Sequence, residues 1–449
     1  MNIFILIGGI LILLGLSYYI NQRNLLAPSL VCCASFLVGT SLLANNALSD
    51  GFDIHPVTVG MILLGLSSVI SGERMAIVGR HYTKSIRQEN SFKTISYIKV
   101  NAKLSIILLA INIVAVYLFY REVVRIGTLA ATLNITSFDD IMSAYRVSMM
   151  FGDTLDYNVN QKVSQLVKVP IVSAYIYLYI FIFNMIKGQK IKKNILNLMV
   201  AIPFFFYTFY SGGRIGFIKI LAAILWYIFI IMYFKKNGRE FHQFESKFKR
   251  NVLIALAVIL GLFYSLRIAM GRANTEDAEF LDYITMYVGT PTRLLDMYLQ
   301  EHHDDEFDIT KSETFTGVSV LLAKMEGKKQ NAGLEFRSSG NGTNLGNVYT
   351  PFRRYYHDFG WFGVILLPLL MGFILAKIQC KTYFCRVYGR RCTFYILLFA
   401  YLYTGLPIYA ADDIFYLRIN IGFVEELVLI YILYKLTIKY AIEQTRTQA

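Results

Sequence analysis

The chain has 449 residues, of which 55% are hydrophobic and only 16% charged, whereas an ordinary soluble domain is about 25% charged. This composition excludes a soluble globular protein and predicts an integral membrane protein. The net charge of +14 does not indicate a nucleic-acid partner, because 26 of the 44 Lys and Arg residues lie in alternate connections between apolar stretches and near the C-terminus, together with only five acidic residues.

Apolar stretches recur along the whole chain, each close to the roughly 20 residues with which a helix crosses about 30 Å of hydrocarbon. They predict an all-α polytopic membrane protein, a single membrane domain over 1–449 with about 11 transmembrane helices. The stretches lie near 2–20, 27–44, 56–71, 104–120, 168–186, 195–210, 215–234, 251–270, 359–376, 393–410 and 420–437.

The basic connections face the cytoplasm by the positive-inside rule. This rule predicts an N-terminus outside, a C-terminus in the cytoplasm and two substantial outer segments, 121–167 and 271–354. The cytoplasmic connections contain no phosphate-binding glycine motif, so no nucleotide-binding domain is expected. The five cysteines show neither a disulfide framework nor paired C-x-x-C spacing, and we therefore expect no metal and no cofactor.

The first outer segment predicts an amphipathic helix around 141–147 that begins near Ser137. It contributes Arg121, Arg125 and Arg146. These arginines could meet an anionic ligand, but contact with lipid headgroups and solvation are the favoured explanation.

Only Ser211-Gly212-Gly213-Arg214 connects the sixth and seventh predicted spans. The two glycines permit a tight reversal, and the next helix starts with free backbone N–H groups at the outer membrane face, which favours a phosphate beside Arg214. Lys219 lies about 7 Å further along this helix. Both cations are candidate diphosphate ligands, and anchoring of the helix end is the alternative for Arg214.

Further candidate diphosphate ligands border or lie in the large outer segment. Arg267 has apolar neighbours on both sides near the outer end of a predicted span, where an arginine is costly, and Arg272 follows just after it. A helix predicted over 280–289 precedes a second helix, for which Thr290 is the expected cap and Pro291 the first residue. Arg293 lies on this second helix.

The stretch 339–363 carries the strongest expectation of chemistry, because charged residues collect there directly before an apolar run. Arg353 is a candidate diphosphate ligand. His357 is a candidate general base because imidazole exchanges protons near neutral pH, and Asp358 either shares this role, orients the imidazole or simply stabilises the first turn of a helix. Sugar stacking and interfacial anchoring are equal alternatives for three nearby aromatic residues, Tyr349, Tyr356 and Trp361.

The order of these motifs resembles that of the bacterial oligosaccharide repeat-unit polymerases, the Wzy-type polymerases of O-antigen (lipopolysaccharide) and capsule. The organisation of spans covers nearly the whole chain, and the motifs cover about a tenth of it. The residues that carry the resemblance are Ser211, Gly213 and Arg214; Tyr287, Gly289, Pro291 and Asp296; and Asn347, Tyr349, Thr350, Arg353, Tyr356, Asp358, Phe359, Gly360 and Gly363.

The resemblance implies a metal-independent membrane glycosyltransferase of GT-C-like plan in the bacterial cytoplasmic (inner) membrane. Its donor and acceptor would be undecaprenyl-diphosphate-linked oligosaccharides, joined at the outer face of that membrane into a surface polysaccharide. A chain-length regulator would be a protein partner, besides the membrane lipid. An O-antigen-ligase-like glycan transferase and a lipid-linked oligosaccharide flippase are the alternatives; a flippase would be expected to place more charge inside its spans.

Overall fold

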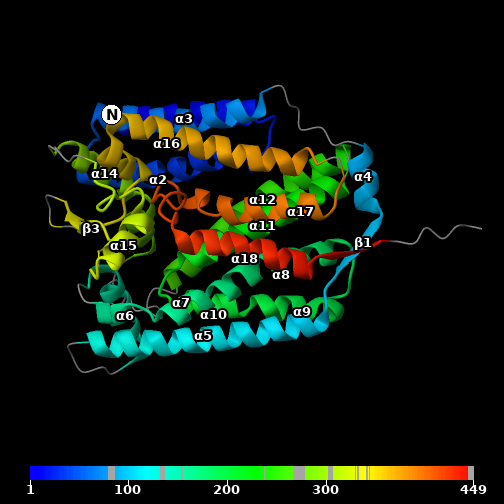
Figure 1. The fold of residues 1–449 in the computed structure, drawn as a ribbon. Coiled ribbons are helices and arrows are strands. Elements are labelled where there is room, and N and C mark those ends of the chain that lie inside the picture. The colour runs from blue at the N-terminus through cyan, green and yellow to red at the C-terminus, as the bar shows by residue number, and fades with distance from the viewer. Residues whose placement is uncertain are drawn as a thin grey trace, which may run out of the picture.

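The computed structural model describes residues 1–78, 86–131, 137–152, 155–236, 238–265, 279–301, 307–328, 330, 333–339, 342, 344–385 and 387–442. Its long helices lie side by side, with α3 and α16 along one edge and α5 along the opposite edge (Figure 1). The long helices are α1 (Asn2–Ile20), α2 (Pro28–Asp50), α3 (Pro56–Ile77), α5 (Ala102–Ala130), α8 (Lys168–Ile186), α11 (Ile215–Lys235), α12 (Gly238–Ser265), α16 (Pro351–Tyr383), α17 (Arg390–Tyr403) and α18 (Ile421–Thr437).

Shorter elements connect these helices at both ends of the molecule. The short helices are α4 (Ile86–Lys93), α6 (Phe138–Phe151), α7 (Gln161–Leu166), α9 (Ile191–Ala201), α10 (Pro203–Tyr210), α13 (Phe280–Val288), α14 (Thr290–Leu299) and α15 (Thr316–Met325), with 3-10 turns at Leu155–Tyr157 and Leu406–Ile408. Two small antiparallel pairs complete the fold: β1 (Ile95–Lys99) with β4 (Lys439–Ile442), and β2 (Arg337–Ser338) with β3 (Asn344–Gly346).

Eight helical stretches within the described residues are long and apolar enough to cross a membrane. Many large hydrophobic side chains on α1 and α18, such as Ile12 and Val428, point outward, as expected of helices that face lipid. The prediction of an all-α, multi-pass membrane protein is therefore confirmed. The count of about eleven spans and the GT-C-like plan stay predictions.

The remaining predicted spans differ from the expectation in length or continuity. The stretch 195–210 is divided between α9 and α10 at Ile202, because Pro203 opens a new helix. The span predicted over 251–270 falls on α12, which begins earlier, at Gly238, in a basic stretch. The last span is α18, which has 17 residues.

Glycine residues allow α3 and α16 to approach each other closely. A Cβ added to Gly72 would lie 1.9 Å from the carbonyl oxygen of Leu369, and one added to Gly372 would lie 2.4 Å from that of Val69. Such contacts require glycine on both helices, as in the small-residue interfaces that hold membrane helices together. The polar residues at the beginning of α16 therefore lie on a helix that packs tightly against α3.

Different secondary-structure elements lie at the two ends of the helical bundle. The elements α6, α14, α15 and β3 gather at one end, whereas α4 and β1 lie at the other (Figure 1). The described parts of both predicted outer segments are therefore on the same side of the bundle, and the basic connection around α4 is on the opposite side. This arrangement is what the predicted topology requires.

A kink at Gly360 divides α16 into a polar part and an apolar part. Gly360 has φ 58° and ψ −151°, a conformation outside the helical region that a glycine adopts at little cost. The polar part begins at Pro351, behind Thr350, and carries all the charged candidates of the 339–363 stretch. Because the helix begins this early, Asp358 is not in its first turn, and of its alternative roles that of a first-turn acid is excluded.

Candidate functional site

Polar side chains from three separate stretches converge on the beginning of α16. They come from α14, from the segment before α15 and from the stretch around β2. We call this group the outer polar cluster; its members are Tyr298, Glu313, Glu335, Tyr349, Arg353 and His357.

Arg353 lies at the centre of the outer polar cluster and is only 3% exposed. Its guanidinium carbon lies 4.5 Å from the ring centroid of Tyr298 and 4.0 Å from that of Tyr349. Its Nη2 donates to Glu313 Oε1 at 3.0 Å and to Glu335 Oε2 at 2.7 Å. Among the described residues, no group accepts a hydrogen bond from its Nε or Nη1. The arginine is thus fixed in place with two buried donors left over for a ligand.

Glu335 and Tyr349 both contact this arginine and each other. Burial alone would raise the pKa of Glu335, but the charge and hydrogen bond of Arg353 lower it below its usual value. Burial raises the pKa of Tyr349, and its hydroxyl donates to Glu335 Oε1 at 2.9 Å. Glu335 therefore carries a negative charge at neutral pH and holds Arg353 from one side. Tyr349 is only 1% exposed, so it packs on the arginine and offers no free face for a sugar.

His357 lies one helical turn after Arg353 and faces the same cluster. Its Nδ1 is 2.8 Å from the hydroxyl of Tyr298, and its Nε2 is 4.0 Å from Glu313 Oε1. The side chain is 21% exposed, so a ligand that enters the cluster can reach it. The structure thus brings together two of the predicted candidates, Arg353 and His357, as residues i and i+4 of one helix.

Asp358, by contrast, is occupied with the backbone of a neighbouring segment. Its Oδ2 accepts from Ser312 Oγ at 2.6 Å and from the Thr314 amide at 2.8 Å, and its Oδ1 accepts from the Glu313 amide at 3.1 Å. The residue is 6% exposed. This geometry favours a positioning role, in which Asp358 holds the segment that carries Glu313.

Arg354 is another charged residue of the 339–363 stretch, although it was not among the candidate ligands, and it fixes the same segment to another part of the chain. Its Nε donates to Asp412 Oδ1 at 2.8 Å and its Nη1 to the Glu313 carbonyl at 3.2 Å. The adjacent Asp413 is fully buried, and burial raises its pKa to about 7 although two backbone amides oppose this shift. The two adjacent acids between the last two apolar stretches, Asp412 and Asp413, are a sequence signal from which this contact could have been predicted.

Arg214 is buried at the start of α11, where the predicted reversal over 211–214 is confirmed, with Gly212 at φ 67°. Its guanidinium stacks over the rings of Tyr283 and Tyr287 on α13, at 5.3 and 5.2 Å. Arg214 therefore packs against α13. Arg353 instead contacts α14, the segment before α15 and the stretch around β2.

Lys219 lies five residues further along the chain, on α11, and the charged residues that influence it are Arg418, Glu426 and Asp412. Arg418 in turn stacks on Tyr401, at 4.3 Å from its ring centroid. The sequence did not single out these partners. All three are half-buried, and Asp412 and Arg418 precede the last apolar stretch.

Arg293 on α14 is directed away from the outer polar cluster. Its guanidinium lies 3.7 Å from the ring centroid of Phe52 and 3.7 Å from Asp50 Oδ2, at the connection between α2 and α3. These contacts explain Arg293 by packing and pairing. Arg267 and Arg272 lie outside the described residues.

Aromatic side chains flank the kink in α16. Tyr356 is half-buried and its ring centroid lies 5.8 Å from that of Trp361, which is 42% exposed. These two rings, unlike that of Tyr349, have surface that a sugar can reach. Stacking of a sugar and anchoring at the membrane surface stay equal interpretations for them.

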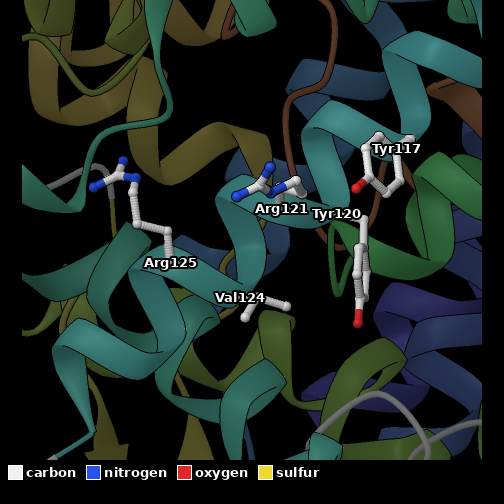
Figure 2. Close-up of a pocket in the computed structure, with 5 residues that line it drawn as sticks. All are labelled: Tyr117, Tyr120, Arg121, Val124 and Arg125. Carbon is white, nitrogen blue, oxygen red and sulfur yellow. The ribbon is translucent and has the colours of Figure 1, made fainter.

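A second group of polar side chains lines a shallow groove along one face of α5. The groove is lined by five side chains of that helix, with two guanidinium groups toward one end and two tyrosine rings toward the other (Figure 2). Arg125 in the groove donates to Glu122 and to two backbone carbonyls. The groove suits contact with lipid headgroups and lacks the paired acid and imidazole of the outer polar cluster. The lining residues are Tyr117, Tyr120, Arg121, Val124 and Arg125.

Comparisons with the profiles of known protein families, with curated proteins and with solved structures find no significant match. The resemblance described from the motifs therefore stays an expectation. Among the described residues, no three His, Cys, Asp or Glu side chains lie close enough to hold a metal ion together.

Proposed function

We propose that the protein is a membrane glycosyltransferase that joins lipid-diphosphate-linked oligosaccharide units into a surface polysaccharide. The observation that carries this proposal is Arg353, a buried guanidinium with two donors unused among the described residues, one turn away from His357. A transfer from a sugar diphosphate needs cations for the leaving group and a proton acceptor for the attacking hydroxyl. The outer polar cluster supplies both kinds of group.

The position of the cluster supports a lipid-linked substrate. It lies at the end of a bundle of apolar helices, directly before the apolar part of α16. A polyprenyl chain would lie in the bilayer beside such helices, while its diphosphate and sugars reach the polar end. In the proposed complex, Arg353 binds a diphosphate oxygen, and Arg214 and Lys219 are further cations near the membrane surface.

Cells from which the protein is deleted are expected to accumulate single lipid-linked repeat units at the outer face of the membrane and to lack the long polymer. Lipid extraction followed by gel and mass analysis of the glycans measures both quantities. Long polymer that remains on its lipid carrier would indicate the ligase alternative. Absence of single units from the outer face would indicate the flippase alternative.

The proposal also requires that the outer polar cluster face away from the cytoplasm. In a variant with Cys385 changed to serine, a cysteine in place of the exposed Ser338 is expected to react with a membrane-impermeant maleimide on intact cells or spheroplasts. A cysteine in place of the exposed Lys192, in a basic connection, is expected to react only after the membrane is opened. The reverse labelling pattern would contradict the proposed side of the membrane.

A further inference from the structure

One carboxylate oxygen of Glu313 accepts a hydrogen bond, and the other is buried and accepts none from the described residues. Its Oε1 accepts from Arg353 and lies 4.0 Å from His357 Nε2. Its Oε2 is inaccessible to solvent and has no hydrogen-bond partner among the described residues. No motif or spacing distinguishes this acid from the other polar residues of the outer segment.

The backbone on both sides of Glu313 is held firmly. Its amide donates to Asp358 at 3.1 Å, and its carbonyl accepts from Arg354 at 3.2 Å. The neighbouring Ser312 and Thr314 donate to the same Asp358 carboxylate. The backbone of Glu313 is therefore fixed, and its side chain is directed into the outer polar cluster by the contact with Arg353.

A buried acceptor without a partner loses its hydration with nothing in return, and the loss is larger when the acceptor is charged. Oε1 alone is enough for the ion pair with Arg353. This ion pair therefore does not explain why Oε2 is buried. A ligand that donates a hydrogen bond would satisfy it. A sugar hydroxyl is such a donor.

The other groups of the outer polar cluster are less suited to take the proton of this hydroxyl. Both oxygens of Asp358 accept hydrogen bonds from the protein. Glu335 accepts from three different side chains and its own side chain is 43% exposed. His357 uses Nδ1 toward Tyr298. Among the described carboxylates beside the guanidinium, Glu313 is the one with an oxygen that no described group uses.

We propose that Glu313 is a catalytic residue, the proton acceptor for the attacking sugar hydroxyl; this rests on the proposed function. The hydroxyl oxygen forms a bond to the anomeric carbon of the donor sugar while its proton passes to Glu313 Oε2. The bond between the anomeric carbon and the diphosphate oxygen breaks, and its electron pair leaves with the diphosphate beside Arg353. His357 and Tyr298 then position the acceptor sugar next to Glu313.

Glu313→Gln tests the role because it removes the acceptor of the proton and keeps an amide oxygen for Arg353. The probe is the lipid-linked repeat unit extracted from cells that lack the protein, added to purified protein in detergent. We expect kcat to fall by about a hundredfold or more with little change in KM. Glu313→Asp, which keeps a carboxylate, is expected to recover part of the rate. In Glu313→Ala, added formate is expected to raise the rate.

The control is Glu326→Gln, because Glu326 is exposed on the same outer segment and pairs with the nearby, exposed Lys328. It should leave kcat and KM unchanged. A Glu313→Gln variant that folds normally and keeps more than about a tenth of the wild-type kcat would overturn the role of Glu313 alone. Wild-type protein that fails to couple these repeat units would overturn the proposed function, and the role of Glu313 with it.

Discussion

Replacing Arg353 by lysine is expected to slow the coupling of lipid-linked repeat units by about a hundredfold to a thousandfold, although the positive charge is kept. The planar guanidinium fits between the rings of Tyr298 and Tyr349 and donates to two carboxylates, while two of its nitrogens, Nε and Nη1, have no partner among the described residues. An ammonium is a compact point donor without a planar face, so it cannot make these contacts together. Loss of one such donor at a transition state typically costs about this much in rate.

The measurement is the initial rate of coupling by purified protein, together with the length of polymer in cells. Arg125→Lys is the matched control, because Arg125 is an exposed arginine of α5 that pairs with Glu122. Both variants must be compared at equal protein level and after a thermal unfolding scan, since a misfolded protein would also give no polymer. A near-wild-type rate for Arg353→Lys would show that only the charge is needed and would remove the bidentate role of this arginine.

Local features of the fold were predictable because their causes lie within a few residues. Ser137 is the N-cap of α6, as its side chain predicted, and it forms a capping box with Asp140. The predicted helix over 280–289 is α13, and the reversal over 211–214 occurs as expected. Thr290, however, is the first residue of α14 and not its cap, because its hydroxyl donates to the Met286 carbonyl.

The site was predictable only in part, because its decisive contacts join distant residues. Arg353 and His357 share a helix face, so their spacing alone places them together. Glu313 reaches Arg353 from 40 residues away, and Asp412 reaches Arg354 from 58 residues away. Nothing in the periodicity of an outer segment tells which of its acids meets the arginine. The choice depends on how the loop folds over α14 and α16.

Asp358 illustrates the same limit for a residue that the sequence did single out. Its position beside His357 suggested a base, an orienting group or a helix-stabilising acid. The structure instead directs its carboxylate to a serine hydroxyl and two amides of the segment 312–314. A side chain's partners decide between such roles, and they come from the tertiary structure.

Replacing Asp358 by alanine is expected to abolish polymer formation and to release the segment before α15. Three hydrogen bonds to one carboxylate would be lost, each worth about 1.5 to 3 kcal/mol, and the buried amides would stay unpaired. Glu313 would then lose its fixed position beside Arg353. Trypsin cleavage after the exposed Lys311 is expected to become faster, while the thermal unfolding of the helical bundle changes little.

Asp358→Asn separates a positioning role from a chemical one. An amide provides one acceptor oxygen where the segment 312–314 uses two, so partial release is expected, and the loss of coupling rate should follow the gain in cleavage after Lys311. Cleavage and rate are measured on the same preparations of wild-type, Asn and Ala proteins. If Asp358→Asn lost all activity while the segment stayed as protected as in the wild type, Asp358 itself would have to act on the substrate, and the role assigned to Glu313 would fall.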